Sequence, residues 1–415
     1  MNTILMIILA VLALCFLVFI HEAGHFLASR AFGVRVTELM LGLPGPGIGK
    51  KIGGTRYGVT VVLLGGYARV CGMEAGEMSP HLKDALASLY RRGTATMEEV
   101  ATDCGITDDE AFEALEELTE WGSCEGPTKK DEFNTYRAPE TRPAKKTRRR
   151  GSAKFGAHAS AGAGSSTRAG AYASASATAP DALASPASAL VVPAPAEVRP
   201  TVSEPAYALG EPRPVNDPQA LFDAEYACQY RALPFWKRSV ILLAGPLVNL
   251  LFTMVAFVVI YSVIGVDLQY TETGEIVHYT ASPLQSIQAG FVYIGMVVQA
   301  VAGLFNPATA AQTVEGSASI VGIVAMSGSF FERGFVDSLF FMAMISVSLG
   351  IMNLLPIPPL DGGRFAVEVF QKLSRKTVSS RAMNYMTVAG MALFLGFFAI
   401  MLNQDIQRIL SGFWS

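Results

Sequence analysis

Three side chains near the N-terminus have the types and the spacing of a zinc site. His21 and His25 lie four positions apart in the stretch His-Glu-Ala-Gly-His. Residues at i and i+4 share one face of a helix, so two neutral imidazoles there can bind a single zinc ion. Glu22 lies between them, where it can take a proton from an attacking water molecule. The pattern predicts a hydrolytic zinc site with two histidine ligands and a glutamate base.

A catalytic zinc ion needs a third protein ligand, and three acidic residues are candidates. Glu368 and Asp405 flank later apolar segments, but neither has a distinctive local sequence. Asp361 follows three prolines in the stretch NLLPIPPLDGG at 353–363, where the backbone must be irregular. Irregular backbone is tolerated at membrane depth only when it is buried in protein or lines a wet cavity. The sequence therefore favours Asp361, with an ordinary Asp-Gly turn as the simpler alternative.

The elements that carry these residues are predicted to be membrane helices. Of the 415 residues, 51% are hydrophobic and only 16% are charged, against about 25% charged in soluble domains. A helix needs about 20 apolar residues to cross a bilayer. We therefore expect a polytopic α-helical membrane protein with about four transmembrane helices. The four segments are Ile4 to about Phe32, Val240–Ile264, Ser338–Pro356 and Met383–Leu402.

Basic residues near the ends of these segments predict their orientation. Basic clusters follow the first segment, precede the second and separate the third from the fourth, whereas the loop after the second carries acidic residues. The clusters should be cytoplasmic and both termini outside. Because the first and third helices then end on one side, His25 and Asp361 are expected at one level. This places the site of a multi-pass protein near the cytoplasmic face of the cell membrane. Two shorter apolar runs, 286–305 and 317–331, must cross zero or two times together.

The chain divides into four predicted regions. Residues 1–73 contain the first transmembrane helix and an alternating pattern from Arg56 to Val70, which indicates a membrane-associated β-hairpin. Residues 74–125 form a small cytoplasmic insertion with helical periodicity, similar to a winged-helix domain. Residues 126–232 are rich in Ala, Ser and Pro and are predicted to be disordered. Residues 233–415 form the membrane core with the other three spans.

Charge guides the expected partners of the cytoplasmic insertion. The net charge of the chain is −3, and the last predicted helix of the insertion is acidic, so no nucleic acid is expected. The periodic segment 82–122 is interpreted as a module for protein interaction or sensing, through which a cytoplasmic regulator could act. The lipid bilayer itself is the other expected partner.

Taken together, the motifs resemble the site-2 protease family of intramembrane zinc metalloproteases, most closely its bacterial branch of regulated intramembrane proteolysis. The resemblance covers the four spans and the Gly-Gly-Tyr hairpin. Its most specific parts are HExxH at 21–25, Ala-Gly-Pro-Leu-Val-Asn at 244–249 and NxxPxPxLDGG at 353–363. One departure concerns PDZ domains, which bacterial relatives usually carry outside the membrane. The segment from Gly265 to Pro283 is too short for one.

The resemblance implies roles for individual residues. Zn²⁺ is the implied cofactor, with His21, His25 and Asp361 as ligands and Glu22 as the catalytic base. Substrate binding is implied for four further residues: Asn353, Gly65, Gly66 and Tyr67. The implied substrates are single-span membrane proteins, such as an anti-sigma factor or a remnant signal peptide, cut within or near the transmembrane segment. Asn249 is interpreted mainly as a helix-packing residue beside Gly245.

Two other functions compete with this hypothesis. A zinc-binding sensor or scaffold without proteolysis would keep the ligands, but it would have no need of a base at Glu22. A metal transporter would usually show internal repeats and interrupted helices at matched positions, and no such symmetry is visible in the sequence. Metal-dependent cleavage of a membrane substrate distinguishes both from a protease.

Overall fold

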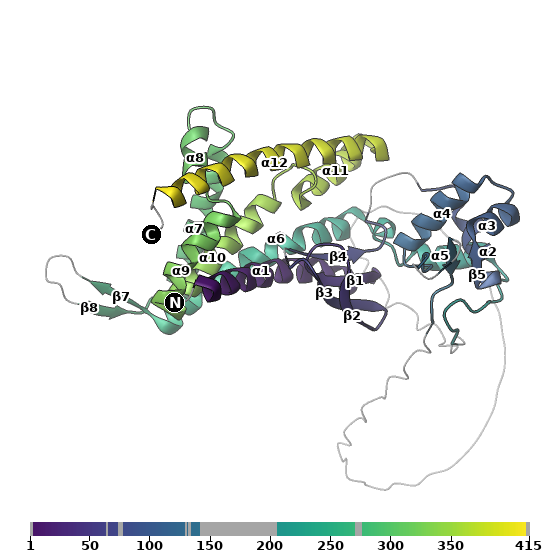
Figure 1. Ribbon diagram of the computed structural model, residues 1–415, viewed down its shortest axis with the longest axis horizontal. Helices are drawn as coiled ribbons and strands as arrows, with labels where there is room; N and C mark the ends of the chain where they lie inside the picture. The colour runs from purple at the N-terminus through teal and green to yellow at the C-terminus, as the bar shows by residue number, and fades with distance from the viewer. Residues whose placement is uncertain are drawn as a thin grey trace, which may run out of the picture. The chain divides into compact units, whose positions relative to one another are not determined.

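Long apolar helices dominate the computed structural model (Figure 1). It describes residues 3–63, 65–73, 78–128, 131, 134–141, 206–269 and 276–411. Within these ranges, five helices are long and apolar enough to cross a membrane. They are α1 (Thr3–Ala31), α6 (Phe235–Val258, continued by a π-helical segment at Val259–Ile264), α7 (Pro283–Gly303), α10 (Phe335–Asn353) and α12 (Ser380–Leu410).

The expectation of about four spans is therefore not confirmed in its number, and the additional candidate span is α7. It begins well before the continuous apolar run, because Ser282 and Gln285 form a capping box and Pro283 occupies the first turn. One of its polar residues is accommodated by pairing: the Ser286 hydroxyl lies 2.6 Å from that of Ser262 on the neighbouring helix. A count of consecutive apolar residues misses such a helix. Two shorter helices, α8 (Ala310–Gly316) and α9 (Ile320–Arg333), are bent by 51° and make one further span if counted together.

Helix α6 packs against both α1 and α10. Polar hydrogen bonds reinforce these contacts: the Thr253 hydroxyl lies 3.2 Å from the carbonyl oxygen of Ala343, and that of Ser346 lies 2.9 Å from the carbonyl oxygen of Asn249. Small and hydroxyl-bearing residues are the usual means by which apolar helices associate in a bilayer. Most large apolar side chains of α12 point outward, as lipid-facing side chains do.

A four-stranded sheet follows α1, with the strand order β2-β3-β1-β4. Its strands are β1 (Val36–Leu41), β2 (Gly47–Ile52), β3 (Thr55–Thr60) and β4 (Gly66–Val70). The predicted hairpin between Arg56 and Val70 is wrong, because β3 and β4 both pair with β1 and lie on opposite sides of it. The true hairpin is β2–β3, which turns at Gly53 and Gly54, both with positive φ. Alternation locates strands but does not determine their partners, and β4 is left at the edge of the sheet.

The insertion between α1 and α6 forms a compact module of helices with one small sheet. It contains α2 (Leu82–Arg92), β5 (Thr94–Thr96), α3 (Met97–Cys104), α4 (Asp108–Glu120), β6 (Thr135–Arg137) and α5 (Pro218–Tyr226). Thr96 and Thr107 form capping boxes at the starts of α3 and α4. Strand β6 pairs with β5, and its Tyr136 is fully buried in the module core.

The predicted disordered region, 126–232, therefore has folded ends. Strand β6 lies in its first part, and in its last part Phe222 and Tyr226 of α5 pack against Trp121. The composition of a long segment is an average, and it hides short pieces that bury aromatic side chains. Residues 142–205, where most of the Ala, Ser and Pro residues occur, lie outside the described residues.

The remaining elements connect the helices. Strands β7 (Val266–Gln269) and β8 (Ile276–Tyr279) pair as an antiparallel hairpin between α6 and α7. A 3₁₀ turn at Tyr230–Ala232 precedes α6, and α11 (Asp361–Ser374) follows α10 after a short irregular segment. All five cysteines are free, as expected from their scattered positions. Burial raises the pKa of Cys71 to about 11 and that of Cys124 to about 12, so both remain protonated thiols.

Candidate metal centre

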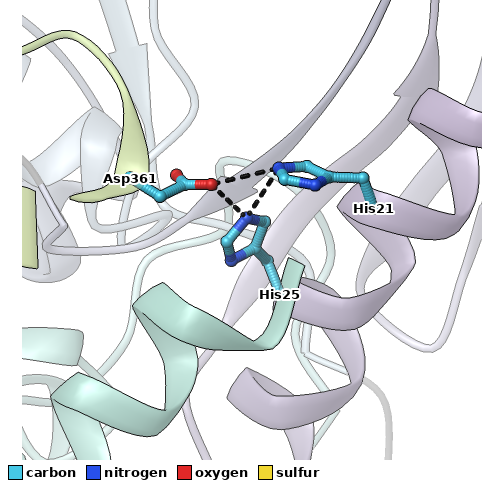
Figure 2. Close-up of side chains that lie close together, drawn as sticks. All are labelled: His21, His25 and Asp361. Carbon is cyan, nitrogen blue, oxygen red and sulfur yellow. Dashed lines mark hydrogen bonds and ion pairs between the residues drawn. The ribbon is translucent and has the colours of Figure 1, made fainter. Parts of the chain in front are cut away.

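Helices α1 and α11 bring together three side chains from opposite ends of the chain (Figure 2). His21 and His25 project from α1, and Asp361 is the first residue of α11. The Oδ2 atom of Asp361 lies 3.0 Å from Nε2 of His21 and 3.2 Å from Nε2 of His25, and the two Nε2 atoms are 3.4 Å apart. These are the three residues that the sequence singled out as zinc ligands.

The spacing and chemistry of the three atoms suit a zinc ion. Ligand atoms at ordinary Zn–N and Zn–O distances in a tetrahedron are roughly 3.3 Å apart, and the three atoms here are separated by 3.0–3.4 Å. Two imidazoles and one carboxylate form a donor set typical of catalytic zinc. Burial alone would raise the pKa of the Asp361 carboxyl, but its hydrogen bonds with His21 and His25 hold that pKa below its ordinary value. The group is therefore an anion, as a zinc ligand must be.

A tightly folded segment holds Asp361 in place. The chain between α10 and α11 turns back on itself, so that a Cβ atom at Gly362 would lie 2.3 Å from the carbonyl oxygen of Leu354. No other residue fits that approach without displacing backbone. Asp361 then starts α11, where the N-terminal end of the helix dipole favours a negative charge. The close approach to Leu354 thus explains the glycine at position 362, and the group formed with the two histidines explains the aspartate at position 361.

One face of α6 forms the wall behind the two histidines. Three residues spaced four apart contribute: Ile241, Gly245 and Asn249, all buried. The carbonyl oxygen of Ile241 lies 2.8 Å from Nδ1 of His25, and Nδ2 of Asn249 lies 3.3 Å from Nδ1 of His21. A Cβ atom at Gly245 would lie 2.2 Å from Nε2 of His25, so the ring occupies the space that a side chain would need.

The contact of Asn249 with His21 was missed by the sequence analysis, which interpreted Asn249 mainly as a packing residue. The available signal was its polarity: a buried amide in an apolar helix is costly unless it has a partner. Its spacing from Gly245 was consistent with either role, so the sequence alone could not identify that partner.

Glu22 lies beside the free edge of the sheet. Its Oε2 accepts a hydrogen bond of 3.0 Å from the backbone N–H of Ala68 in β4. Gly66, two residues earlier in the strand, is also close, since a Cβ atom there would lie 3.5 Å from Cγ of Glu22. Helix α1 therefore presents two ligating side chains and a carboxylate, and the carboxylate is held by the edge strand β4.

The other residues implied in substrate binding are placed differently. Gly65 has a positive φ of 92° and accepts a hydrogen bond from Gly42 through its carbonyl oxygen. The Tyr67 hydroxyl lies 3.1 Å from a carboxylate oxygen of Glu38. The Asn353 amide donates to the carbonyl oxygen of Leu349, one turn earlier in its own helix. Of the four, Gly66 is the one that the structure brings directly against Glu22.

The two alternative ligands are engaged elsewhere. Glu368 forms an ion pair with Arg238 at 3.1 Å. Asp405 is fully buried on α12, where it accepts hydrogen bonds from the backbone N–H groups of Ser319 and Gly322 at the start of α9. Neither belongs to the group formed by the two histidines and Asp361.

Comparison with known proteins gives a consistent result. The family model for peptidase family M50 matches residues 9–397. A protein of Campylobacter jejuni that carries the name of a zinc metalloprotease is 30% identical over 123 residues, which cover 30% of this chain and 33% of that protein. A similarly named protein of Lactococcus lactis is 30% identical over 29% of this chain and 28% of its own length. The chain thus matches about a third or less of the length of these curated relatives.

Proposed function

This chain belongs to peptidase family M50, and from that membership we propose that it is a zinc-dependent metalloprotease that cuts peptide bonds within or near transmembrane segments. The observation that carries the proposal is the convergence of His21, His25 and Asp361, with their ligating atoms 3.0–3.4 Å apart. In this proposal these residues are the zinc ligands and Glu22 is the base. The names of the curated relatives support the same reaction.

The chemistry divides between the metal and the chain. A zinc ion at this site would polarise the scissile carbonyl and acidify water. Glu22 takes the proton of the attacking water and passes it to the leaving nitrogen. The N–H of Ala68 orients the Glu22 carboxylate for this role. Asp361, an anion at a helix start, supplies the negative charge that a site with two neutral imidazoles lacks.

The edge strand offers a way to hold the substrate. A peptide bond inside a transmembrane helix is shielded by hydrogen bonds, so the helix must unwind before it can be cut. Strand β4 is an edge strand, and Gly66 and Ala68 lie beside Glu22. An unwound substrate segment that pairs with this edge would be extended next to the base. Gly65, Tyr67 and Asn353 belong to the same proposal as supports of the strand and of the substrate backbone.

The proposal includes a location and a class of partners. The five apolar helices indicate a multi-pass membrane protein. In this proposal the site lies near the cytoplasmic face of the cell membrane, which the positions of the basic clusters support. The substrates are single-span membrane proteins of the anti-sigma-factor or remnant-signal-peptide type, processed by regulated intramembrane proteolysis. The module around 82–122 is the proposed contact for a cytoplasmic regulator.

Glu22→Gln tests this function directly. Cleavage of a co-expressed single-span substrate should fall by about 10²- to 10⁴-fold, because general-base catalysis is lost. The zinc content per protein should be unchanged, because the three ligands remain. Glu332→Gln, at an exposed glutamate of α9, is the matched control and should cleave normally. Full cleavage by the Glu22→Gln protein would exclude the proposed mechanism.

A further inference from the structure

Each candidate zinc histidine has a second ring nitrogen, and both of these nitrogens face α6. The Nε2 atoms point to Asp361, whereas Nδ1 of His25 and Nδ1 of His21 contact Ile241 and Asn249 respectively. A neutral imidazole carries one proton, so a nitrogen that ligates a metal leaves the proton on the other nitrogen. The partners on α6 therefore determine which tautomer each histidine adopts.

For His25 the hydrogen-bond partner permits only one neutral tautomer. The carbonyl oxygen of Ile241, 2.8 Å from Nδ1, can accept a hydrogen bond but cannot donate one. Nδ1 must therefore carry the proton, and the lone pair of Nε2 is directed at the group formed with His21 and Asp361. The backbone of α6 thus holds His25 in the ligating tautomer.

For His21 the partner is a side-chain amide, which can either donate or accept. The Nδ2 atom of Asn249 lies 3.3 Å from Nδ1 of His21. An amide nitrogen only donates, so this arrangement suits an unprotonated Nδ1, and it leaves the proton on the nitrogen that should ligate zinc. The Oδ1 atom of Asn249 is buried and has no hydrogen-bond partner in the part of the chain that the structure describes. No second hydrogen bond there fixes the orientation of the amide.

We propose that Asn249 is a positioning residue for His21: its amide accepts the Nδ1 proton of His21 through Oδ1, which leaves Nε2 to ligate zinc. Oxygen and nitrogen exchange places in a half-turn of the amide without changing its shape, so the buried site accommodates this orientation. Its backbone is held independently, since the carbonyl oxygen of Asn249 accepts a hydrogen bond from Ser346. This inference rests on the proposed function, because it assumes that His21 ligates zinc through Nε2.

The competing explanation is that Asn249 only fills space between α6 and α1. The two explanations differ in what a replacement must preserve. A packing residue needs volume, which Asn249→Leu retains approximately. A positioning residue needs an acceptor oxygen, which Asn249→Asp retains and Asn249→Leu removes. Mutation of a second-sphere partner of a metal-ligating histidine commonly weakens metal affinity by about 10- to 100-fold.

The experiment measures zinc affinity in the full-length protein in detergent, by competition with a chelator. Asn249→Leu should bind zinc about 10- to 100-fold more weakly than the parent, and Asn249→Asp should bind it as tightly as the parent or more tightly. Ser346→Ala is the matched control: it removes one of two hydrogen bonds to the backbone carbonyl oxygen of Asn249, which Thr253 still holds, and should leave the affinity unchanged. In Co²⁺-substituted protein, the visible absorption bands should shift in Asn249→Leu and stay unaltered in Ser346→Ala.

Equal zinc affinity of Asn249→Leu and the parent would overturn the proposal. So would equal weakening in Asn249→Asp and Asn249→Leu when both remain folded by thermal melting, since packing alone would then explain the effect. Asn249→Ala replaces the leucine variant if leucine prevents folding. A parent protein that binds no zinc would overturn the proposed function itself, which separates that failure from a failure of the Asn249 inference.

Discussion

Among single residues, Asp361 is held differently from the two histidines. His21 and His25 belong to one continuous helix, whereas Asp361 depends on the tight segment that precedes α11. It supplies the one formal negative charge among the three candidate ligands. Because its carboxylate contacts both histidines, its loss should affect the whole site.

The Asp361→Asn variant should lose most of its zinc. The amide keeps the shape of the carboxylate but removes its charge, and a neutral amide oxygen is a much weaker ligand for zinc. The measurement is zinc per protein by elemental analysis after dialysis against a mild chelator. Asp337→Asn, in the first turn of α10, changes a carboxylate away from the site and serves as the control. Unchanged zinc content in Asp361→Asn would exclude Asp361 as a ligand.

Site residues that are close together in the sequence were easier to predict than those that are far apart. His21, Glu22 and His25 form a local motif, which can be recognised directly in the sequence. Asp361 is 340 residues from His21, and it was predicted because prolines at membrane depth imply a buried polar site. No comparable feature of the sequence around Asn249 indicates its contact with His21. Its contact depends on how α6 is rotated against α1, which sequence spacing does not report.

Among the elements, the face of α6 that contacts α1 tolerates the fewest changes of side chain. Ile241, Gly245 and Asn249 lie four residues apart and all meet a histidine. The closest approach is at Gly245, where the ring of His25 occupies the position of a side chain. Helix packing and ligand geometry are therefore determined by the same contact.

Gly245→Ala should displace His25 and weaken zinc binding, although alanine favours helices over glycine by up to about 1 kcal/mol. The added methyl group would lie 2.2 Å from Nε2 of His25, so the ring or the helix must move. Zinc affinity and thermal melting are both measured. Gly295→Ala in α7 is the control, because a Cβ atom there meets nothing within 4 Å. Normal zinc affinity in Gly245→Ala would show that the helices separate without moving the ligand.

Strands and helices differed in how well the sequence predicted them. Alternation correctly indicated strands on both sides of residues 61–65, yet it paired them with each other rather than with β1. A parallel pairing between β1 and β3 needs a long-range contact, which no local pattern contains. Helix α7 was underestimated for a related reason, because Ser286 is polar in sequence but paired with Ser262 in the fold.

At the scale of the whole molecule, Arg35 joins the module of α2–α5 to the segment that follows α1. Its guanidinium donates to the carbonyl oxygen of Gly122, 3.0 Å away, and to a carboxylate oxygen of Glu225, 2.7 Å away. Burial would lower the pKa of Arg35, but the Glu225 carboxylate raises it above its ordinary value. The same residue starts the connection to β1, whose neighbour β4 contacts Glu22. The module is thus linked to the candidate active site through consecutive contacts.

Arg35→Met should loosen this link and destabilise the docked module. A hydrogen bond to a charged partner is worth about 1.5–3 kcal/mol, and Glu225 would be left without its cation. Hydrogen exchange in α4 and α5 should become faster, whereas exchange in α10 should not change. Adding Glu225→Gln should recover part of the protection, because the unpaired charge is removed. Unaltered exchange in Arg35→Met would show that the module docks without this ion pair.

The contact between Asp361 and His21 also restricts how many times the chain crosses the membrane. Asp361 follows α10 and the histidines lie in the second half of α1, so both helices must reach the site from the same side. Helix α6 returns to the starting side, and the number of crossings between α6 and α10 must therefore be even. That number is zero or two, and α7 is long and apolar enough to cross; if α7 crosses, the bent pair α8–α9 must supply the second crossing. With α7 crossing, we expect six crossings in all, and this count does not depend on the charge distribution.

Labelling with a membrane-impermeant maleimide in intact cells tests this count. Thr280→Cys, before α7, and Glu332→Cys, at the end of α9, should be labelled from outside. Ala308→Cys, between α7 and α8, should be labelled only after the cells are permeabilised. All three positions are exposed on the protein surface. Labelling of Ala308→Cys in intact cells would show that α7 does not cross. Protection of Glu332→Cys would make the number of crossings odd, which the contact between Asp361 and His21 does not allow.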